Sequence, residues 1–169
     1  MIPATAELLR LEDTQPLALA TPLNAAIPGD WPPEEVRGVL GFFADQMDAG
    51  VTGDGWVNYY WIAHTGDGAP PVLVGSGGFK SKPQSGAVEI GYGTLKQFQR
   101  QGYATEAVSA LTQWALSQPD VLRVVADALP ENTASVRVLE KNGFTEAGPG
   151  EEEGTRRFEV VQTVAETSE

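Results

Sequence analysis

The spacing of apolar residues changes along the chain and predicts a mixture of helices and strands. From Tyr103 to Ala115, apolar side chains recur every three or four residues, as on the buried face of a helix. Residues 121–128 form a mainly apolar run of strand length, which is typical of a strand buried on both faces. With another strand expected at 87–95, this order predicts a strand–helix–strand crossover that is parallel and right-handed.

Outside this crossover, turn residues and propensities divide the chain into shorter elements. Aromatic and β-branched residues favour strands, glycine and proline mark turns, and Asn132 suits a helix N-cap. Further strands are expected at 5–11, 56–64, from Pro71 onward, at 144–148 and at 156–164, and further helices at 17–27, 33–50 and 132–142. The order of these elements predicts a mixed α/β (α+β) fold.

The composition is that of an ordinary globular chain and excludes several chemistries. The 169 residues are expected to form one domain, residues 1–169, which is long enough to bury a core without disulfides. The lack of cysteine excludes thiol catalysis, and a single histidine, His64, excludes a double-histidine site, so we expect no metal. The sequence has neither a basic-then-apolar leader nor an apolar run of membrane length, which predicts a cytoplasmic protein without a membrane partner.

Charge is distributed unevenly around a net value of −12. This acidity disfavours a nucleic-acid partner, because such partners need clustered Lys and Arg. Residues 1–70 carry 2 basic and 10 acidic side chains, whereas residues 80–141 carry 7 basic and 6 acidic ones. An anionic ligand is therefore expected only near the middle segment and a cationic ligand near the flanks, although solubility alone also explains the imbalance.

The segment from Gln99 to Ala104 has the composition of a phosphate-binding turn. It lies where a strand is expected to end and a helix to begin, and a helix N-terminus offers unpaired N–H groups to an anion. Gly102 permits close approach of a phosphate, and Arg100 adds a charge that can reach a phosphate oxygen. A tight turn without a ligand explains these residues equally well.

The same segment carries a resemblance to a known family, and two further blocks agree with it. Gln99-x-x-Gly102-x-Ala104 resembles the acetyl-CoA pyrophosphate loop of the GNAT N-acetyltransferase superfamily. The block from residue 132 to 144 is similar to the family's Asn-x-x-Ala/Ser helix ending in Gly-Phe. The strand at 88–93 resembles the one that splays from its neighbour to admit the pantetheine arm.

The resemblance covers about residues 72–158 and implies both a fold and an activity. The implied fold is a central, mostly antiparallel sheet with a parallel splayed strand pair and flanking helices. The implied activity is direct transfer of an acetyl group from acetyl-CoA to a primary amine, either a protein N-terminus or a small molecule. The nearest branch is the ribosomal-protein-alanine N-acetyltransferase-like (RimJ/RimL-type) one, in which homodimers are common.

The resemblance also assigns cofactor-binding roles to ten residues. Backbone groups at one strand would hold the pantetheine, amides at the following turn would cradle the pyrophosphate, and one asparagine would bind the cofactor arm. These residues are, in that order, Tyr92, Gly93 and Thr94; Arg100, Gln101, Gly102, Tyr103, Ala104 and Thr105; and Asn132. The charged side chains of Arg137 and Lys141 are weaker candidates for contact with the nucleotide phosphate.

Acetyl transfer needs a neutral amine and therefore a general base. An alkyl ammonium such as that of lysine has a pKa of about 10.4, so most of it is charged at neutral pH. The resemblance makes Glu89 the first candidate for the base, and Asp127, at the end of the next strand, is the second. Either carboxylate also suits a structural ion pair.

The group that protonates the leaving thiolate is less well defined. Many family members have Tyr seven residues after the motif Asn, but this chain has Leu139 there, which cannot donate a proton. The nearest hydroxyl is that of Ser135, which becomes the candidate acid or thiolate-orienting group. Tyr92 and Tyr103 are alternatives, and transfer without a dedicated acid is another.

An acceptor pocket is expected between the early helices and the strands. Aromatic faces attract cations, and nearby acids would attract an amine, although the same aromatic residues also suit a core. Candidate walls are Trp31, Trp56, Tyr59, Tyr60 and Trp61, and the candidate acids are Asp30, Glu34 and Glu35. The sequence leaves the acceptor open, and a catalytically weak acyl-CoA-binding module is the alternative function.

Overall fold

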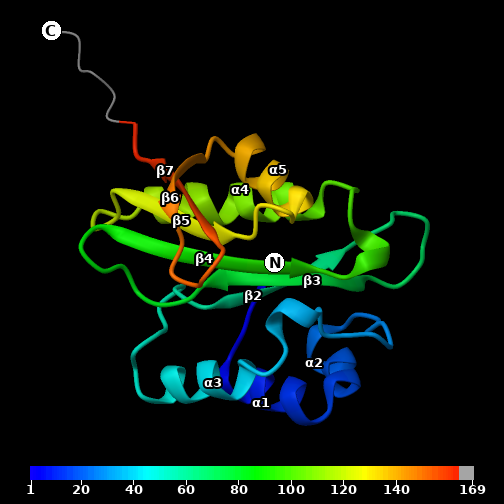
Figure 1. Ribbon diagram of the computed structural model, residues 1–169. Helices are drawn as coiled ribbons and strands as arrows, with labels where there is room; N and C mark the ends of the chain where they lie inside the picture. The colour runs from blue at the N-terminus through cyan, green and yellow to red at the C-terminus, as the bar shows by residue number, and fades with distance from the viewer. Residues whose placement is uncertain (164–169) are drawn as a thin grey trace, which may run out of the picture.

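The computed structural model describes residues 1–163 and has a mixed α/β fold around a seven-stranded sheet (Figure 1). The strand order is β1-β2-β3-β4-β5-β7-β6, and every neighbouring pair is antiparallel except β4 and β5. The strands are β1 (Ile2–Pro3), β2 (Asn58–Ala63), β3 (Val72–Phe79), β4 (Ala87–Thr94), β5 (Arg123–Ala128), β6 (Thr145–Pro149) and β7 (Arg156–Val161). The predicted mostly antiparallel sheet with one parallel pair is confirmed.

Helices cover both faces of the sheet and bury a core on each side (Figure 1). One face carries the N-terminal layer, which consists of α1 (Ala6–Thr14), α2 (Ala20–Leu23), α3 (Leu40–Asp48) and the 3₁₀ turns η1 (Pro16–Leu19) and η2 (Glu34–Val36). The other face carries α4 (Tyr103–Leu116) and α5 (Thr133–Lys141), and a 3₁₀ turn η3 (Lys96–Phe98) precedes α4. The sheet is therefore the middle layer of three.

The strand–helix–strand crossover is confirmed as β4, α4 and β5. The apolar face of α4 is buried against the sheet, and Val108, Leu111 and Ala115 are at most 2% exposed. The adjoining strand β5 contributes Val124 and Ala126 to the same core. The apolar periodicity of this segment thus reports its burial directly.

The first predicted strand, Thr5–Leu11, is wrong, because these residues begin a helix. Thr5 is the N-cap of α1, and its hydroxyl accepts a hydrogen bond from the Leu8 N–H. Leu9 and Glu12 are buried, which is the three-residue spacing of a helix rather than the alternation of a strand. Thr at an N-cap satisfies an otherwise unpaired N–H, and that local bond decides the element.

Both early helices are shorter than predicted. The segment 17–27 ends its helix at Leu23, and Asn24 takes a left-handed conformation as the C-cap. The segment 33–50 is interrupted at Gly38, whose positive φ of 80° is incompatible with a continuous helix. Only η2 and α3 form in that region, and the turn between them leaves η2 free to contact the sheet.

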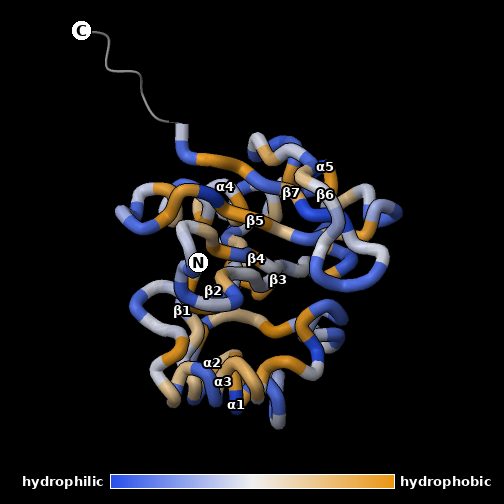
Figure 2. The backbone as a smooth tube through the Cα atoms, turned by 60° about the vertical axis from the view of Figure 1, so that its left-hand side comes forward, coloured by the Kyte–Doolittle hydropathy of each residue, from blue (hydrophilic) through white to orange (hydrophobic). Residues whose placement is uncertain are grey.

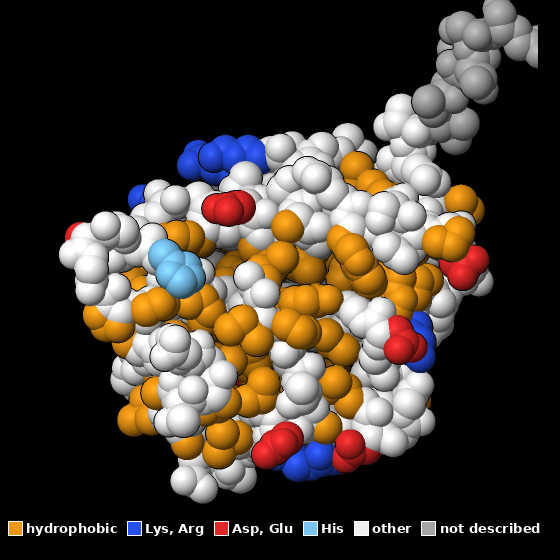
Figure 3. Space-filling view, turned by 180° about the vertical axis from the view of Figure 1, so that it is seen from behind, with side chains coloured by type: hydrophobic (Ala, Val, Ile, Leu, Met, Phe, Trp, Pro, Cys, Tyr) orange, Lys and Arg blue, Asp and Glu red, His pale blue; other side chains and the backbone are white. Residues whose placement is uncertain are grey.

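Hydrophilic and apolar residues are distributed as the three layers require. Hydrophilic stretches concentrate in the turns around the rim, and apolar stretches run through the middle (Figure 2). Seen from behind, apolar side chains cover the centre of one face, and charged ones lie mainly at its edge (Figure 3). The predicted last strand, 156–164, ends at Val161, and Val164 lies outside the described residues. No helix among the described residues is long and apolar enough to cross a membrane.

Candidate active site

The parallel strands β4 and β5 separate partway along their length. They pair only where Ala87–Glu89 faces Arg123–Val125, although β4 continues to Thr94. On its other side, β4 stays paired with β3 through Thr94. The C-terminal half of β4 therefore has one edge without a strand partner, as the resemblance predicts for the strand that admits pantetheine.

The backbone groups of Tyr92 and Thr94 face this opened edge. Glu89 accepts a backbone hydrogen bond from Lys80, and Leu95 donates one to Val74, so odd-numbered residues direct their polar groups toward β3. Because neighbouring residues of a strand bond to opposite sides, the even-numbered residues direct theirs toward the opening. The Gln99 side chain donates to the Thr94 carbonyl at 3.1 Å, which ties the following turn to this edge.

The turn before α4 has the geometry of an anion-binding loop. Arg100 and Gly102 both have positive φ values, 61° and 87°, and the helix begins at the next residue, Tyr103. Such a turn points consecutive N–H groups outward at the positive end of the helix dipole. A Cβ atom built on Gly102 would meet no atom within 4 Å, so the space in front of the turn is open.

A cleft of about 440 Å³ joins the opened strand edge to this turn, within the size range of small-molecule sites. It is lined by residues of β4, the turn, α4, α5 and η2. Every predicted cofactor residue except Gln101 lies on its wall, namely Tyr92, Gly93, Thr94, Arg100, Gly102, Tyr103, Ala104, Thr105 and Asn132. Gln101 instead donates from its side chain to the Gln97 carbonyl at 3.1 Å.

Two hydroxyl groups meet on the α5 side of the cleft. The Tyr92 hydroxyl lies 3.0 Å from the Ser135 hydroxyl and 3.2 Å from its carbonyl oxygen. Burial raises the pKa of Tyr92 to about 12, although its bond to Ser135 opposes the rise. Asn132 caps α5 by accepting from the Ser135 N–H at 3.2 Å, which fixes the start of that helix. Tyr92 therefore remains a neutral hydroxyl that can donate a proton.

The charges on the cleft wall are mostly positive. Arg100, Arg137 and Lys141 line it, and among the described lining residues Glu35 alone carries a carboxylate. In a chain of net charge −12, this concentration of cations gives the cleft a local charge that suits an anionic ligand. These three cations belong to residues 80–141, the middle segment near which the sequence predicts an anionic ligand.

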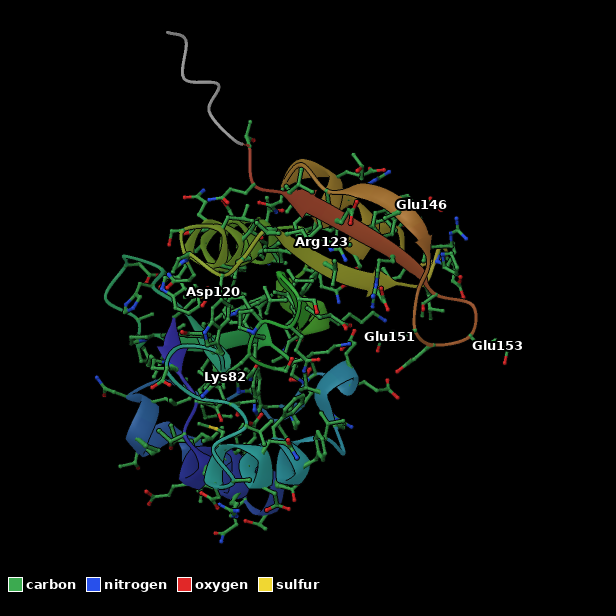
Figure 4. The ribbon with its side chains drawn as sticks, turned by 90° about the vertical axis from the view of Figure 1, so that its left-hand side faces the viewer. Lys82, Asp120, Arg123, Glu146, Glu151 and Glu153 are labelled. Carbon is green, nitrogen blue, oxygen red and sulfur yellow. The ribbon has the colours of Figure 1, made fainter. Side chains whose placement is uncertain are left out.

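The two predicted bases, Glu89 and Asp127, lie outside the cleft wall and share one cation. Arg157 forms a two-pronged pair with Asp127 at 2.8 and 3.0 Å and lies 3.5 Å from Glu89. Glu89 also forms an ion pair with Lys80. Glu151, in the β6–β7 turn, approaches the same guanidinium at 3.4 Å, whereas Glu153 points away (Figure 4).

The proton affinity of Asp127 is low for a base. Burial alone would raise its pKa, but hydrogen bonds from Arg157 and from the Glu151 N–H outweigh burial and hold the pKa below its ordinary range. A carboxylate held by a guanidinium is a weak proton acceptor. The geometry favours the structural ion pair that the sequence left open for this residue.

The aromatic residues expected to form acceptor walls pack in the cores instead. Trp31, Tyr60 and Trp61 are at most 3% exposed, and Trp56 and Tyr59 pack against the core beneath α4. None of the five is on the cleft wall. Leu139, at the place of the family's Tyr, is also fully buried, so that position faces the core. His64 lies on the surface, as expected.

Sequence reasoning missed the ion pairs of Arg157 and the place of Glu35 on the cleft wall. Arg157 joins Asp127 across 30 positions of sequence, and no local pattern links the two. Glu35 was expected only to attract an amine, whereas the structure brings it to the cleft beside Gly93. An acid within a short 3₁₀ turn gives no local signal of such a long-range contact.

These features together define a class of protein. A splayed strand edge, an anion-binding helix start and a cleft that connects them are what the resemblance predicts for acyl-CoA-dependent transferases. Comparison with known proteins makes the family definite. The acetyltransferase (GNAT) domain model matches residues 6–145, so the chain belongs to the GNAT acetyltransferase family.

Individual relatives agree with that placement. An uncharacterized N-acetyltransferase of Bacillus subtilis strain 168, YjdG, is 34% identical over 69% of this chain and 67% of its own length. Matches to four further curated relatives cover only 33–44% of their lengths. An acetyltransferase from Agrobacterium tumefaciens C58 shares the fold with a TM-score of 0.60, at 20% identity over 95% and 89% of the two chains.

A second fold neighbour was solved with a nucleotide cofactor. The microcin C7 self-immunity acetyltransferase MccE, in complex with acetyl-CoA and AMP, gives a TM-score of 0.57 at 18% identity. The match covers 95% of this chain and 90% of that one. At this identity the likeness concerns the fold.

Proposed function

We propose that this protein transfers an acetyl group from acetyl-CoA directly to a primary amine, in the manner of the ribosomal-protein-alanine N-acetyltransferase-like (RimJ/RimL-type) branch. The observation that carries the proposal is the cleft, which joins the opened edge of β4 to the amide-rich turn before α4. The acceptor is a protein N-terminus or a small-molecule amine. A cytoplasmic location and a homodimer are part of the same proposal.

The residues of the cleft fit the three chemical parts of the cofactor. The backbone groups of Tyr92 and Thr94 face the opening and would pair with the pantetheine amides as a neighbouring strand would. The open space before Gly102 and the outward amides of its turn suit a pyrophosphate. When bound, acetyl-CoA supplies the acetyl thioester.

The Tyr92–Ser135 pair suits the leaving side of the reaction. The raised pKa keeps the Tyr92 hydroxyl protonated, and Ser135 can orient that proton or relay its own. The pair supplies hydroxyl groups on the cleft wall in a chain that has Leu139 in place of the family's Tyr. Ser135 therefore keeps the predicted role of acid or thiolate-orienting group, with Tyr92 as its partner.

The thermal unfolding midpoint with and without acetyl-CoA tests the cofactor site. Ligand at 100 times its dissociation constant stabilises a fold by about 2.7 kcal/mol, which raises the midpoint of a domain of this size by roughly 5–10 °C. Gly102→Glu should abolish the rise, because a non-glycine residue is strained at this φ and the new carboxylate would repel the pyrophosphate.

The matched control is Gly66→Glu. Gly66 also has a positive φ and open space around its Cβ position, but it lies in the turn between β2 and β3. It should bear the same strain and keep the acetyl-CoA shift. If Gly102→Glu keeps the shift as well, the turn does not bind the pyrophosphate. A chain that binds acetyl-CoA and acetylates none of a panel of amines is instead the acyl-CoA-binding module.

A further inference from the structure

Glu35 occupies a special place on the cleft wall. It comes from the N-terminal layer, whereas the other lining residues come from β4, the turn before α4, α4 and α5. A Cβ atom built on Gly93 would lie 3.1 Å from the Glu35 carboxylate and 3.1 Å from the Pro33 side chain. The carboxylate therefore lies directly over the backbone of β4 at the opened edge.

Side-chain alternation along β4 shows which face this is. Tyr92 and Thr94 project on one face, where Tyr92 meets Ser135 of α5, and Gly93 belongs to the opposite face. The cleft thus passes from the α4–α5 side through the opened edge to the side of the N-terminal layer. With acetyl-CoA held at the turn before α4, the Glu35 side of the opening stays free for the amine acceptor.

The segment that carries Glu35 is braced against both halves of the molecule. Arg37 donates to the carbonyls of Asp30 and Pro32 at 3.1 and 3.0 Å. Gln97, just before the phosphate-binding turn, donates to the Asp30 carboxylate at 3.0 Å. Trp31 donates to the buried Glu12 at 2.9 Å. These contacts hold the backbone on either side of Glu35, at residues 30–32 and at Arg37, and so set where the segment presents its carboxylate.

Glu89, the other candidate base, is far from Gly93 at the opened edge, and the Lys80 side chain lies between the two. Glu89 lies four residues before Gly93, which is about 13 Å along an extended strand. The Lys80 side chain lies between them, because its Cε is 3.3 Å from the Cβ position of Gly91. Glu89 is paired with Lys80 and Arg157 rather than facing the cleft.

We propose that Glu35 binds the acceptor ammonium and takes its proton, so that it is the general base of the transfer. The inference rests on the proposed function. The ammonium nitrogen loses two protons in all. One passes to the Glu35 carboxylate and then to solvent, and the other balances the proton that the leaving sulfur gains at the Tyr92–Ser135 side. The nitrogen lone pair forms the C–N bond as the C–S bond breaks, and the C–S electron pair goes to sulfur.

The test compares Glu35→Gln with wild type on two kinds of acceptor. Spermidine and butylamine are charged at pH 7, whereas hydroxylamine is already neutral. For the charged amines, kcat/KM should fall about 10²–10⁴-fold at pH 7, the usual contribution of a general base. The deficit should shrink as pH rises toward the pKa of the amine, and it should be small with hydroxylamine. Glu35→Asp should recover part of the rate.

Two further variants serve as references. Glu7→Gln removes an exposed carboxylate of α1 that lies outside the cleft wall and should keep the wild-type rate. Glu89→Gln should lack the pH-dependent deficit. If Glu89→Gln shows that deficit and Glu35→Gln does not, the base is Glu89 and the assignment of Glu35 is overturned.

A binding measurement separates this inference from the proposed function. Calorimetric titration of the CoA-loaded protein with spermidine should show about tenfold weaker binding in Glu35→Gln, as expected for one lost charge-assisted hydrogen bond. Wild-type acetylation with equal rates and equal spermidine binding in Glu35→Gln overturns the role of Glu35 alone. A wild-type protein that binds acetyl-CoA but neither binds nor acetylates any amine overturns both.

Discussion

Two carboxylates with little exposure to solvent, one on each side of the molecule, are held by different kinds of donor. In the N-terminal layer, Glu12 is 1% exposed and accepts hydrogen bonds from the Trp31 indole at 2.9 Å and the Tyr60 hydroxyl at 2.7 Å. In the C-terminal half, Asp127 is held by the two-pronged guanidinium of Arg157. The first has only neutral donors, and the second has a cation.

The difference appears in their affinities for protons. Burial raises the pKa of Glu12 to about 7, because the hydrogen bonds from Tyr60 and Trp31 offset only part of the desolvation. The pKa of Asp127 is held below its ordinary range, since Arg157 and a backbone N–H outweigh the burial that would raise it. Neutral donors thus leave a carboxylate titratable near pH 7, whereas a guanidinium keeps it ionised.

The largest expected effect is a pH dependence of stability that Glu12 carries. Its pKa is 4.5 when unfolded and about 7 when folded, so the folded state holds a proton that the unfolded state releases between these values. The resulting stability is fully present below pH 4.5 and is lost as pH rises through about 7, roughly 3 kcal/mol in all. Glu12→Gln should remove this loss.

Urea unfolding at pH values from 4.5 to 8 measures this pH-dependent stability. The free energy of unfolding of Glu12→Gln, relative to wild type, should rise by about 3 kcal/mol across that range. The exposed Glu7→Gln provides the reference and should follow wild type in parallel. Parallel curves for Glu12→Gln would mean that Glu12 does not titrate there, and the contrast with Asp127 would fail.

The next effect tests the C-terminal member of the pair. Arg157→Met leaves Asp127, whose side chain is 9% exposed, without its cation, and should cost about 2 kcal/mol of unfolding free energy at pH 7. The cost should shrink at acid pH as Asp127 takes up a proton. The neighbouring Arg156 pairs with Glu146 at the surface, so Arg156→Met should change stability by about 0.5 kcal/mol or less. Equal costs for the two variants would show that Asp127 does not depend on Arg157.

The C-terminal half was largely predictable from sequence because its determinants are local. The apolar face of α4 repeats within a single helix, and Asn132 caps α5 through a residue three positions away. The turn at Gly102 lies directly between the elements it connects. Nine of the ten predicted cofactor residues therefore line one cleft, with Gln101 as the exception.

The N-terminal layer was harder because its determinants are distant in sequence. Thr5 is a residue type that favours strands, but its side chain caps a helix. Gly38 interrupts a segment that is otherwise compatible with a helix. Glu35 reaches the cleft only because η2 packs against β4. Its neighbour there, Gly93, lies more than 50 positions further along the chain. Such contacts follow from tertiary packing, which no local spacing reports.

The smallest expected effect separates the hydrogen bond of Glu12 from its burial. Tyr60→Phe removes one of the two donors and leaves a carboxylate oxygen unpaired, which costs most when Glu12 is ionised. The destabilisation should therefore be about 1 kcal/mol greater at pH 8 than at pH 5, where the protonated carboxyl needs the donor less. Tyr59→Phe also removes a hydrogen bond, to the Gly55 carbonyl at 2.9 Å, but that acceptor does not titrate. Its cost should be the same at both pH values, so a pH-independent cost for Tyr60→Phe as well would show that the charge of Glu12 does not change between pH 5 and pH 8.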